Sequence, residues 1–420
     1  MPIMLRRTAT AARLVHQRTS ISARIAATAF RSESFSSTSS SCSPNSKKDD
    51  RPDLFLPRIT EKRLHEGGPG GRSSNAGVKI AIFGATGFVG KHLCQNLGHN
   101  GVYAYIGNRG DEVDIRDIKP MFDLGHTRFV FYSPRDVDSM KEVIGDADIV
   151  INLISKTHDT GQPISTSKFP FLGWQTNYSI EDVNVGIAKQ IAELCVEMQV
   201  DNLIHVSAAG ISEDHPSEWA RTKYRGEQIV REIYPWATIV RPTQLFGSED
   251  KFLHYFANMS KMYGVVPVLG DGRRLTQPVW AVDVAKIISR ITDAPEKFEG
   301  RTVDCFGPSD YTYEELGKFV LDLIEQDKKV VHVPEKFYLM MAKALGYQSF
   351  VTMNEDMAKL WSRDMLPAMT AEAYRNQPEQ GKILTMEDLG ITATPIEKEA
   401  FSYLHRFRTA GHFGRVDGYH

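Results

Sequence analysis

Three glycines at three-residue spacing, set between an apolar run and a helical pattern, constrain the fold of this chain more than any other feature. The apolar run Val78–Phe83 has the length of a buried strand and leads directly into Gly84-Ala85-Thr86-Gly87-Phe88-Val89-Gly90. A helical pattern follows through Leu93 and Leu97. Glycines permit a tight turn and a close backbone approach to a pyrophosphate, while the helix N-terminus offers free N–H groups. The strand–turn–helix context therefore predicts a nucleotide-phosphate loop rather than a plain turn, although the spacing is not Gly-x-Gly-x-x-Gly.

The end of the next predicted strand indicates which dinucleotide the loop binds. Val102–Ile106 is predicted to be a strand, and Arg109 follows it. Sites for NAD usually place Asp or Glu about 20 residues beyond the glycine loop, where the carboxylate binds the ribose 2′-hydroxyl. A guanidinium group at this place binds a phosphate through paired hydrogen bonds. The sequence therefore favours NADPH over NAD; the alternative is a solvated surface arginine that Asp111 neutralises.

Further apolar runs alternate with helical patterns through the first half of the chain. The predicted strands are 128–132, 148–154, 202–206 and 238–240, and the predicted helices are 137–144, 177–198 and 219–233. Such alternation predicts an α/β fold, a doubly wound parallel sheet of the Rossmann type with ligands at the carboxyl ends of its strands. The sequence predicts a dinucleotide-binding domain over 78–243. A smaller, irregular α/β docking domain, partly interleaved with the first, is predicted over 244–420.

These residues resemble the extended and atypical short-chain dehydrogenases. The resemblance covers about residues 78–300 and rests on the glycine loop, Asn152-Leu153-Ile154-Ser155, Ser207, Lys223 and Arg241-Pro242. The family often has an aspartate near the adenine after the third strand, where this chain has Ser133-Pro134.

The resemblance breaks at the catalytic position. In the family a serine, a tyrosine and a lysine four residues after the tyrosine carry proton transfer. Here Trp219 stands four residues before Lys223, and none of the 15 tyrosines has a lysine four residues on. An indole N–H donates a hydrogen bond but relays no proton at neutral pH. The resemblance therefore implies a bound cofactor without a catalytic residue.

The residues predicted to bind the cofactor come from the loop and from the strand ends. They are Gly84, Thr86, Gly87, Phe88, Val89, Gly90, Arg109, Asn152, Leu153, Ile154, Ser207, Lys223, Pro242 and Thr243. No metal ligands are predicted, because the sequence has neither a His-Glu-x-x-His spacing nor a Cys-x-x-Cys pair.

A narrower resemblance rests on the segments 71–74, 119–125, 203–207, 246–253, 277–284 and 387–395, of which the last lies outside the dehydrogenase core. These segments are similar to those of the NADPH-binding accessory subunits of mitochondrial NADH:ubiquinone oxidoreductase (respiratory complex I). This resemblance implies a tightly bound, structural NADPH and the other complex I subunits as partners. It also implies a position on the matrix side of the inner membrane, where the matrix arm meets the membrane arm.

The N-terminal segment is predicted to be a targeting sequence rather than part of the folded domain. Residues 1–32 hold six arginines, no lysine and no acidic residue, and nine serines follow within residues 32–46. An amphipathic, Arg-rich, Ser-rich and acid-poor segment is typical of a mitochondrial transit peptide, with a disordered basic tail as the alternative. Without residues 1–46 the formal charge changes from −2 to −7. Residues 47–77, which end in a Gly-rich stretch, are predicted to be a linker.

Composition excludes several classes of protein. A chain of 420 residues with 41% hydrophobic and 24% charged residues is typical of globular proteins rather than disordered ones. No run of 18 uncharged apolar residues occurs, so no membrane-spanning helix is predicted. The near-zero charge argues against a nucleic-acid partner. The apolar run Phe337–Leu345 is predicted either to contact a membrane-embedded partner or the membrane, or to be a core helix.

The leading hypothesis is a non-catalytic complex I subunit that holds NADPH and supports assembly. Two alternatives stay open. One is a mitochondrial NADP-dependent reductase or epimerase with a substitute acid such as Tyr224. The other is a module that senses NADP(H) and signals to a partner.

Overall fold

The computed structural model describes residues 77–157, 161–163, 174–176, 178–345, 355–367 and 383–408. All of these residues belong to the second of two units, Pro52–His420, while the first unit is Met1–Arg51. The predicted transit peptide over 1–46 lies outside the described residues. So does the predicted linker over 47–77, apart from Gly77.

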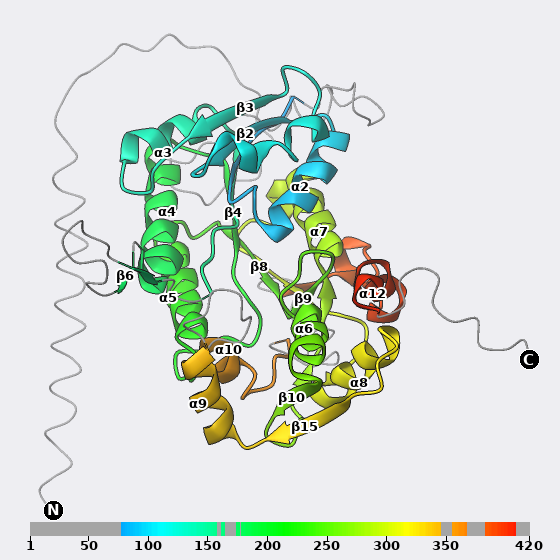
Figure 1. Cartoon of the computed structure of the whole chain (residues 1–420). Coiled ribbons are helices and arrows are strands. Elements are labelled where there is room, and N and C mark those ends of the chain that lie inside the picture. Colours follow the sequence, from blue (N-terminus) through cyan, green and yellow to red (C-terminus); the bar gives the residue numbers. More distant parts are fainter. Residues whose placement is uncertain are drawn as a thin grey trace, which may run out of the picture. The chain divides into compact units, whose positions relative to one another are not determined.

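An eight-stranded sheet forms the centre of the described chain (Figure 1). In sheet order its strands are β16 (Leu384–Thr385), β13 (Thr302–Cys305), β8 (Thr238–Pro242), β7 (Asn202–Val206), β4 (Ile149–Asn152), β1 (Lys79–Phe83), β2 (Tyr103–Asn108) and β3 (Thr127–Phe131). All neighbouring strands are parallel, so that Ile82 lies level with Ile106 and Ile151. The two central strands β4 and β7 are buried throughout, as expected of a parallel sheet covered on both faces. The predicted doubly wound parallel sheet is confirmed.

Helices cover both faces of this sheet, as Figure 1 shows. On one face, α2 (Phe88–His99) and α7 (Ala281–Asp293) pack against each other and bury apolar side chains such as Leu93 and Ile288 against the strands. The opposite face carries α3 (Val137–Ile144), α4 (Ala188–Glu197) and α5 (Glu218–Ile233), whose core includes Ile191 and Val230. The carboxyl ends of all strands consequently open at one edge, where ligands bind in such folds.

The helix predicted over 177–198 is confirmed from Ile180 onward, but its first turns are largely π-helical. The structure has a π-helix over Asp182–Ile187 that continues into α4. Asn184 lies in the π-helix and is buried, and both ends of its amide group are used. Its Oδ1 accepts from the Lys156 backbone N at 3.0 Å, and its Nδ2 donates to Thr222 Oγ1 at 3.1 Å. The wider π-turn therefore carries a side chain that joins the loop after β4 to α5.

The second half of the chain completes the sheet and also builds a core of its own. Strands β13 and β16 extend the sheet beyond β8. A separate core joins α6 (Leu253–Tyr263), α8 (Tyr313–Leu323), α9 (Glu335–Leu345), α10 (Glu355–Leu360) and α12 (Ile396–Leu404) with the parallel pair β10 (Val265–Leu269) and β15 (Lys329–Val333). The predicted division at residue 243 stays a prediction.

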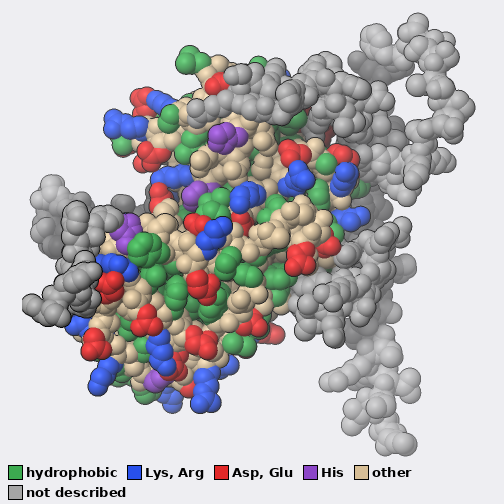
Figure 2. All heavy atoms as spheres, turned by 90° about the vertical axis from the view of Figure 1, so that its right-hand side faces the viewer, with side chains coloured by type: hydrophobic (Ala, Val, Ile, Leu, Met, Phe, Trp, Pro, Cys, Tyr) green, Lys and Arg blue, Asp and Glu red, His purple; other side chains and the backbone are tan. Residues whose placement is uncertain are grey.

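Two surface properties bear on where the chain works. Among the described residues, no helix is both long enough and apolar enough to cross a bilayer. On the face drawn in Figure 2, acidic and basic side chains are interspersed with hydrophobic ones. In α9, Tyr338 is buried, whereas Phe337 and Met340 are more than half exposed, at 54% and 61%. This helix is therefore anchored by one aromatic side chain and presents two other apolar side chains at the surface.

Candidate functional site

The glycine loop forms a cradle in which side chains have no room. Gly84 adopts a φ of +87°, which favours glycine, and its carbonyl accepts from the Gly87 N–H at 3.1 Å. A Cβ at Gly90 would lie 2.4 Å from the Gly84 oxygen. Helix α2 begins directly after Gly87 without a side-chain cap and without an acidic residue in its first turn. Its first N–H groups and its partial positive charge are thus available to an anion.

A cavity of about 460 Å³ opens from this loop along the carboxyl edge of the sheet. Ten of the predicted cofactor-binding residues line it: Gly84, Gly87, Phe88, Val89, Gly90, Leu153, Ser207, Lys223, Pro242 and Thr243. They come from the ends of β1, β4, β7 and β8 and from α2 and α5. The tertiary structure therefore brings together residues that lie up to 159 positions apart in sequence.

Four predicted residues, Thr86, Arg109, Asn152 and Ile154, do not line the cavity. Asn152 is buried beneath it, where its Nδ2 lies 3.2 Å from His205 Nδ1 and its Oδ1 accepts from the Ile154 N–H at 3.0 Å. It thereby fixes the turn that carries Leu153. Thr86 is half-buried within the glycine loop.

Arg109 is exposed at the end of β2. Its guanidinium carbon lies 5.9 Å from the centre of the Tyr178 ring. No carboxylate of the described residues forms an ion pair with it, Asp111 included. Arg109 is therefore placed beside the glycine loop but outside the main cavity.

Lys223 is the buried cation of the site. Its Nζ donates to the Val206 carbonyl at 3.0 Å, and burial lowers its pKa to about 8. One turn further along α5, Glu227 is fully buried and bonds Arg241 at 3.1 Å and Arg231 at 3.2 Å. Burial raises the pKa of Glu227, but the hydrogen bond and charge of Arg241 outweigh burial and leave that pKa below its usual value. An ionised carboxylate that pairs with two arginines therefore lies one turn beyond Lys223, and its charge favours the protonated lysine.

Trp219 faces the cavity one turn before Lys223 on α5. Its indole Nε1 donates to Ser155 Oγ over 3.3 Å. The neighbouring Tyr224, considered above as a substitute acid, is not among the residues that line the cavity. The described geometry therefore offers no tyrosine hydroxyl beside Lys223.

Part of the cavity wall comes from residues that the sequence analysis did not predict to bind the cofactor. Phe252, Leu360 and Met365 line it, together with Asp356. The segment 355–367 is held in place because the Met365 N–H donates to the Leu275 carbonyl at 3.0 Å. These residues form no sequence motif, because they have no regular spacing. The packing of the second core places them at the cavity.

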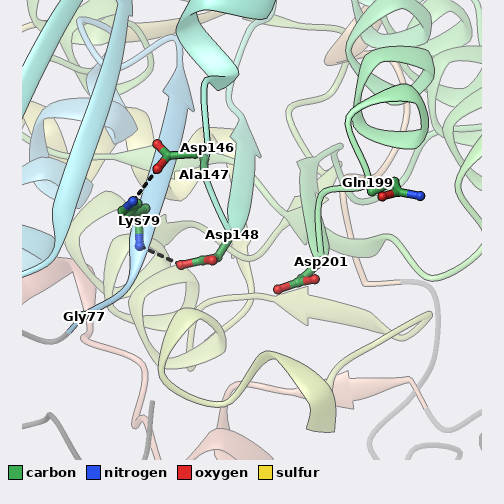
Figure 3. A pocket seen from close by; sticks show the side chains of 7 residues that line it. All are labelled: Gly77, Lys79, Asp146, Ala147, Asp148, Gln199 and Asp201. Carbon is green, nitrogen blue, oxygen red and sulfur yellow. Dashed lines mark hydrogen bonds and ion pairs between the residues drawn. The ribbon is translucent and has the colours of Figure 1, made fainter. Parts of the chain in front are cut away.

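A second, smaller hollow of about 190 Å³ lies at the other ends of the strands, away from the glycine loop. Figure 3 shows the residues that line it. The Lys79 ammonium contacts Asp146 there, and its backbone N–H donates to Asp148 at 2.9 Å. Because Lys79 begins β1 and Asp148 precedes β4, this hollow is at the amino ends of the strands. It is therefore not part of the glycine-loop site.

Nothing in the described part of the chain indicates a metal or thiol centre. No group of three His, Cys, Asp or Glu side chains is close enough there to hold a metal ion. Cys94, Cys195 and Cys305 are buried, and burial raises the pKa of the Cys94 thiol to about 12. These cysteines are therefore packing residues rather than reactive thiols.

Comparison with known proteins identifies the family. The model of the NAD dependent epimerase/dehydratase family matches residues 80–305. The chain belongs to this family. Among solved structures it resembles, at a TM-score of 0.55, the dTDP-glucose 4,6-dehydratase of Streptomyces venezuelae with NAD and TYD bound. The two share 16% identity, and the match covers 79% of this chain and 96% of the dehydratase, so it shows a common fold.

Two nearer relatives of this epimerase/dehydratase family member are mitochondrial proteins. It is 32% identical to the Mus musculus protein named NADH dehydrogenase (ubiquinone) 1 alpha subcomplex subunit 9, over 83% of this chain and 87% of the mouse protein. The Arabidopsis thaliana protein of the same name is 31% identical over 82% of this chain and 81% of its own length. The predicted resemblance to both the broad and the narrow family is confirmed.

The residues present fit a dinucleotide. A Cβ at Gly90 would fill the cradle, and a Cβ at Gly84 would lie 3.1 Å from the Leu153 carbonyl carbon, so glycine is needed at both places. The uncapped start of α2 complements a pyrophosphate, and Lys223 complements a ribose hydroxyl or a phosphate.

Proposed function

We propose that this chain is an accessory subunit of mitochondrial respiratory complex I that holds NADPH in a structural role and catalyses no reaction itself. One observation carries the proposal: an intact phosphate cradle stands beside Trp219, an indole at the place of the family's acid. The names of the mouse and Arabidopsis relatives support the choice of assembly. The alternative function, carbonyl reduction or epimerisation, lacks the family's tyrosine hydroxyl beside Lys223 in the described cavity.

In this proposal the residues of the site bind the cofactor and do not react with it. The loop at Gly84, Gly87 and Gly90 and the start of α2 bind the pyrophosphate. Lys223 and Ser207 bind the ribose on the nicotinamide side, and Pro242 and Thr243 border the nicotinamide. Bound NADPH would supply a hydride to a reaction. In this chain Trp219 donates its only N–H to Ser155 and has no proton to deliver at neutral pH.

Cofactor binding then acts on stability. A ligand that binds only the folded chain increases the free energy of unfolding, by about 2.7 kcal/mol at a hundred times its Kd. The cavity is built from both halves of the chain, with Lys223 on one side and Met365 on the other. Bound NADPH therefore joins the two halves and supports the shape that partner subunits contact.

We place the subunit in mitochondria, on the matrix side of the inner membrane. The relatives are named as mitochondrial, and the N-terminal 32 residues have the composition of a transit peptide. Phe337 and Met340 on α9 are exposed and suit contact with subunits of the membrane arm or with the membrane surface.

The test starts from native mitochondria. The tagged chain is isolated after native fractionation, denatured in alkali, and its released nucleotide is identified by chromatography. We expect co-migration with a megadalton respiratory assembly and about one NADPH per copy. A free monomer or dimer would reject the assembly role. Release of NAD alone, or of no nucleotide, would reject the cofactor.

A second measurement addresses catalysis. The isolated chain with NADPH is incubated with a panel of aldehydes, ketones and nucleotide sugars, and NADPH absorbance is followed. We expect no consumption. Turnover that Lys223→Ala abolishes would establish an enzyme instead.

A further inference from the structure

One short turn of the chain packs against the start of α2. The turn spans residues 247–252, and residues 249–252 line the main cavity. Gly247 adopts a φ of +153°, and a Cβ there would lie 2.8 Å from the ring of Phe88, the first residue of α2. Glu249 pairs with Lys91 of the same helix at 2.9 Å. The turn is therefore in direct contact with the helix end at which the pyrophosphate is proposed to bind.

The buried carboxylate of Asp250 holds this turn in place. Its Oδ2 accepts from the Gly247 backbone N–H at 2.9 Å. Its Oδ1 accepts from the backbone N–H of His254 at 3.1 Å and lies 2.8 Å from Nδ1 of the same side chain. His254 is in the first turn of α6, so the carboxylate also joins the turn to that helix.

The same carboxylate bonds a segment near the C-terminus. We call residues 396–407, which are α12 and the turn after it, the C-terminal strap. Tyr403 of the strap donates its hydroxyl to Asp250 Oδ2 at 3.1 Å, and its ring stacks on His254 with the ring centres 5.4 Å apart. Phe407 packs edge-on against His254 at 5.6 Å. Burial raises the pKa of Tyr403 above its usual value, so its hydroxyl stays protonated and donates.

The proton on His254 is assigned by the partners of its ring. Arg406 of the strap contacts His254 Nε2 through Nη2. A guanidinium only donates, so Nε2 accepts, and Nδ1 carries the proton that is donated to Asp250. Hydrogen bonds therefore run from Arg406 through His254 to Asp250, and a separate bond runs from Tyr403 to the same carboxylate. Because this carboxylate is buried, the loss of one donor is costly.

Other contacts hold the strap at its two ends, away from the cavity. Arg408, directly after the strap, pairs with Glu325 at 2.8 Å. Before the strap, the Thr394 N–H donates to the buried carboxylate of Asp283 at 2.9 Å. These contacts remain when the bonds to Asp250 are removed, so the role of Asp250 can be separated from the folding of the strap.

We infer that Asp250 couples the glycine loop to the C-terminal strap, so that a bound dinucleotide strengthens the attachment of residues 396–407. A pyrophosphate on the first N–H groups of α2 fixes Phe88 and Lys91, which contact the turn, and the turn directs the Asp250 carboxylate towards Tyr403 and His254.

The coupling is reciprocal, because an attached strap must strengthen dinucleotide binding by the same factor. The inference rests on the proposed binding of NADPH and deepens it. It gives the cofactor one defined target, the strap, in addition to a general effect on stability. Asp250, His254, Tyr403 and Arg406 are positioning residues in this scheme.

The experiment follows hydrogen–deuterium exchange of the full chain by mass spectrometry, without nucleotide and with saturating NADPH. In the wild type we expect NADPH to slow exchange of the strap amides by about fivefold or more, the usual range of a coupling between two sites. Tyr403→Phe removes only the hydroxyl and should bring this protection ratio close to one, with a matching loss of NADPH affinity in calorimetry. Arg406→Met changes an exposed side chain, so the variant should fold, and it should also reduce the ratio.

Two controls separate coupling from a structural effect. Ser402→Ala removes the neighbouring hydroxyl, which donates to the Glu399 carbonyl within α12, and should change neither exchange nor affinity. Glu325→Gln loosens the strap at Arg408 without touching Asp250. Strap exchange should then be faster both with and without NADPH, while the protection ratio is retained.

The possible failures are distinguishable. Strap exchange that does not change when calorimetry shows NADPH bound would overturn the inference and leave the proposed function standing. A Tyr403→Phe chain that keeps the wild-type protection ratio would overturn it as well. A wild-type chain that binds no NADPH in calorimetry would overturn the proposed function itself.

Discussion

Trp219 donates its indole N–H to the Ser155 hydroxyl across 3.3 Å, so the side chain that stands in for the family's acid forms a structural link. The bond joins α5 to the loop after β4, and that loop supports the glycine cradle, because Leu153 lies against Gly84. A position used for proton transfer elsewhere in the family thus stabilises the walls of the cofactor cavity in this chain.

Trp219→Phe is expected to decrease the free energy of unfolding by about 1 kcal/mol, the usual net value of one hydrogen bond, and to leave NADPH bound. Chemical denaturation measures the first quantity, and chromatography of released nucleotide measures the second. Loss of the nucleotide in this variant would show that the indole contacts the cofactor directly.

Gly90→Ala is expected to weaken nucleotide binding at least tenfold, because the new Cβ would lie 2.4 Å from the Gly84 oxygen and 2.5 Å from the Ala85 oxygen. Either α2 or the loop must move, and the cradle widens. Gly186→Ala is the control, since a Cβ at Gly186 meets nothing within 4 Å. Calorimetric titration with NADPH compares the two; equal affinities would contradict a tight backbone approach.

Lys223→Met is expected to stabilise the nucleotide-free chain at pH 7 while weakening NADPH binding. Burial lowers the pKa of Lys223 from 10.5 to about 8 in the folded chain. Between these values the unfolded chain holds a proton that the folded chain lacks, so the wild-type free energy of unfolding increases as the pH rises from about 8 to 10.5.

The methionine variant should lack that increase and should gain on the order of 1 kcal/mol at pH 7. Urea denaturation of both proteins at pH 7 and at pH 10 checks the sign. A variant less stable than the wild type at pH 7 would mean that the bond from Lys223 to the Val206 carbonyl outweighs the cost of burial.

Glu227→Gln is expected to destabilise the chain by about 3 kcal/mol, because it removes the buried carboxylate that pairs with the half-buried Arg231 and Arg241. The folded pKa of Glu227 lies below its usual value, so its stabilising effect is present at neutral pH and is lost as the pH falls through that folded pKa. Thermal unfolding from pH 7 to pH 3 should show a steeper loss in the wild type than in the variant. Parallel curves would contradict this assignment.

The sequence by itself determined the sheet, the loop and the cofactor class. Buried parallel strands are nearly continuous apolar runs, and the glycines at 84, 87 and 90 permit the tight turn from β1 into α2. The absence of the family's catalytic tyrosine could also be predicted from the sequence. A spacing of four residues on a helix places two side chains on one face, and the residue four positions before Lys223 is Trp219. For these features the information is local.

Only the tertiary structure decided the rest of the site. In the π-helix, Asn184 bonds partners 28 and 38 positions away, which no local periodicity records. Leu360 and Met365 reach the cavity through the second core, and Tyr403 bonds Asp250 in the cavity wall across 153 positions of sequence. The physical reason is common to all three: hydrogen bonds, burial and charge act over a few ångströms in space, whatever the distance along the chain.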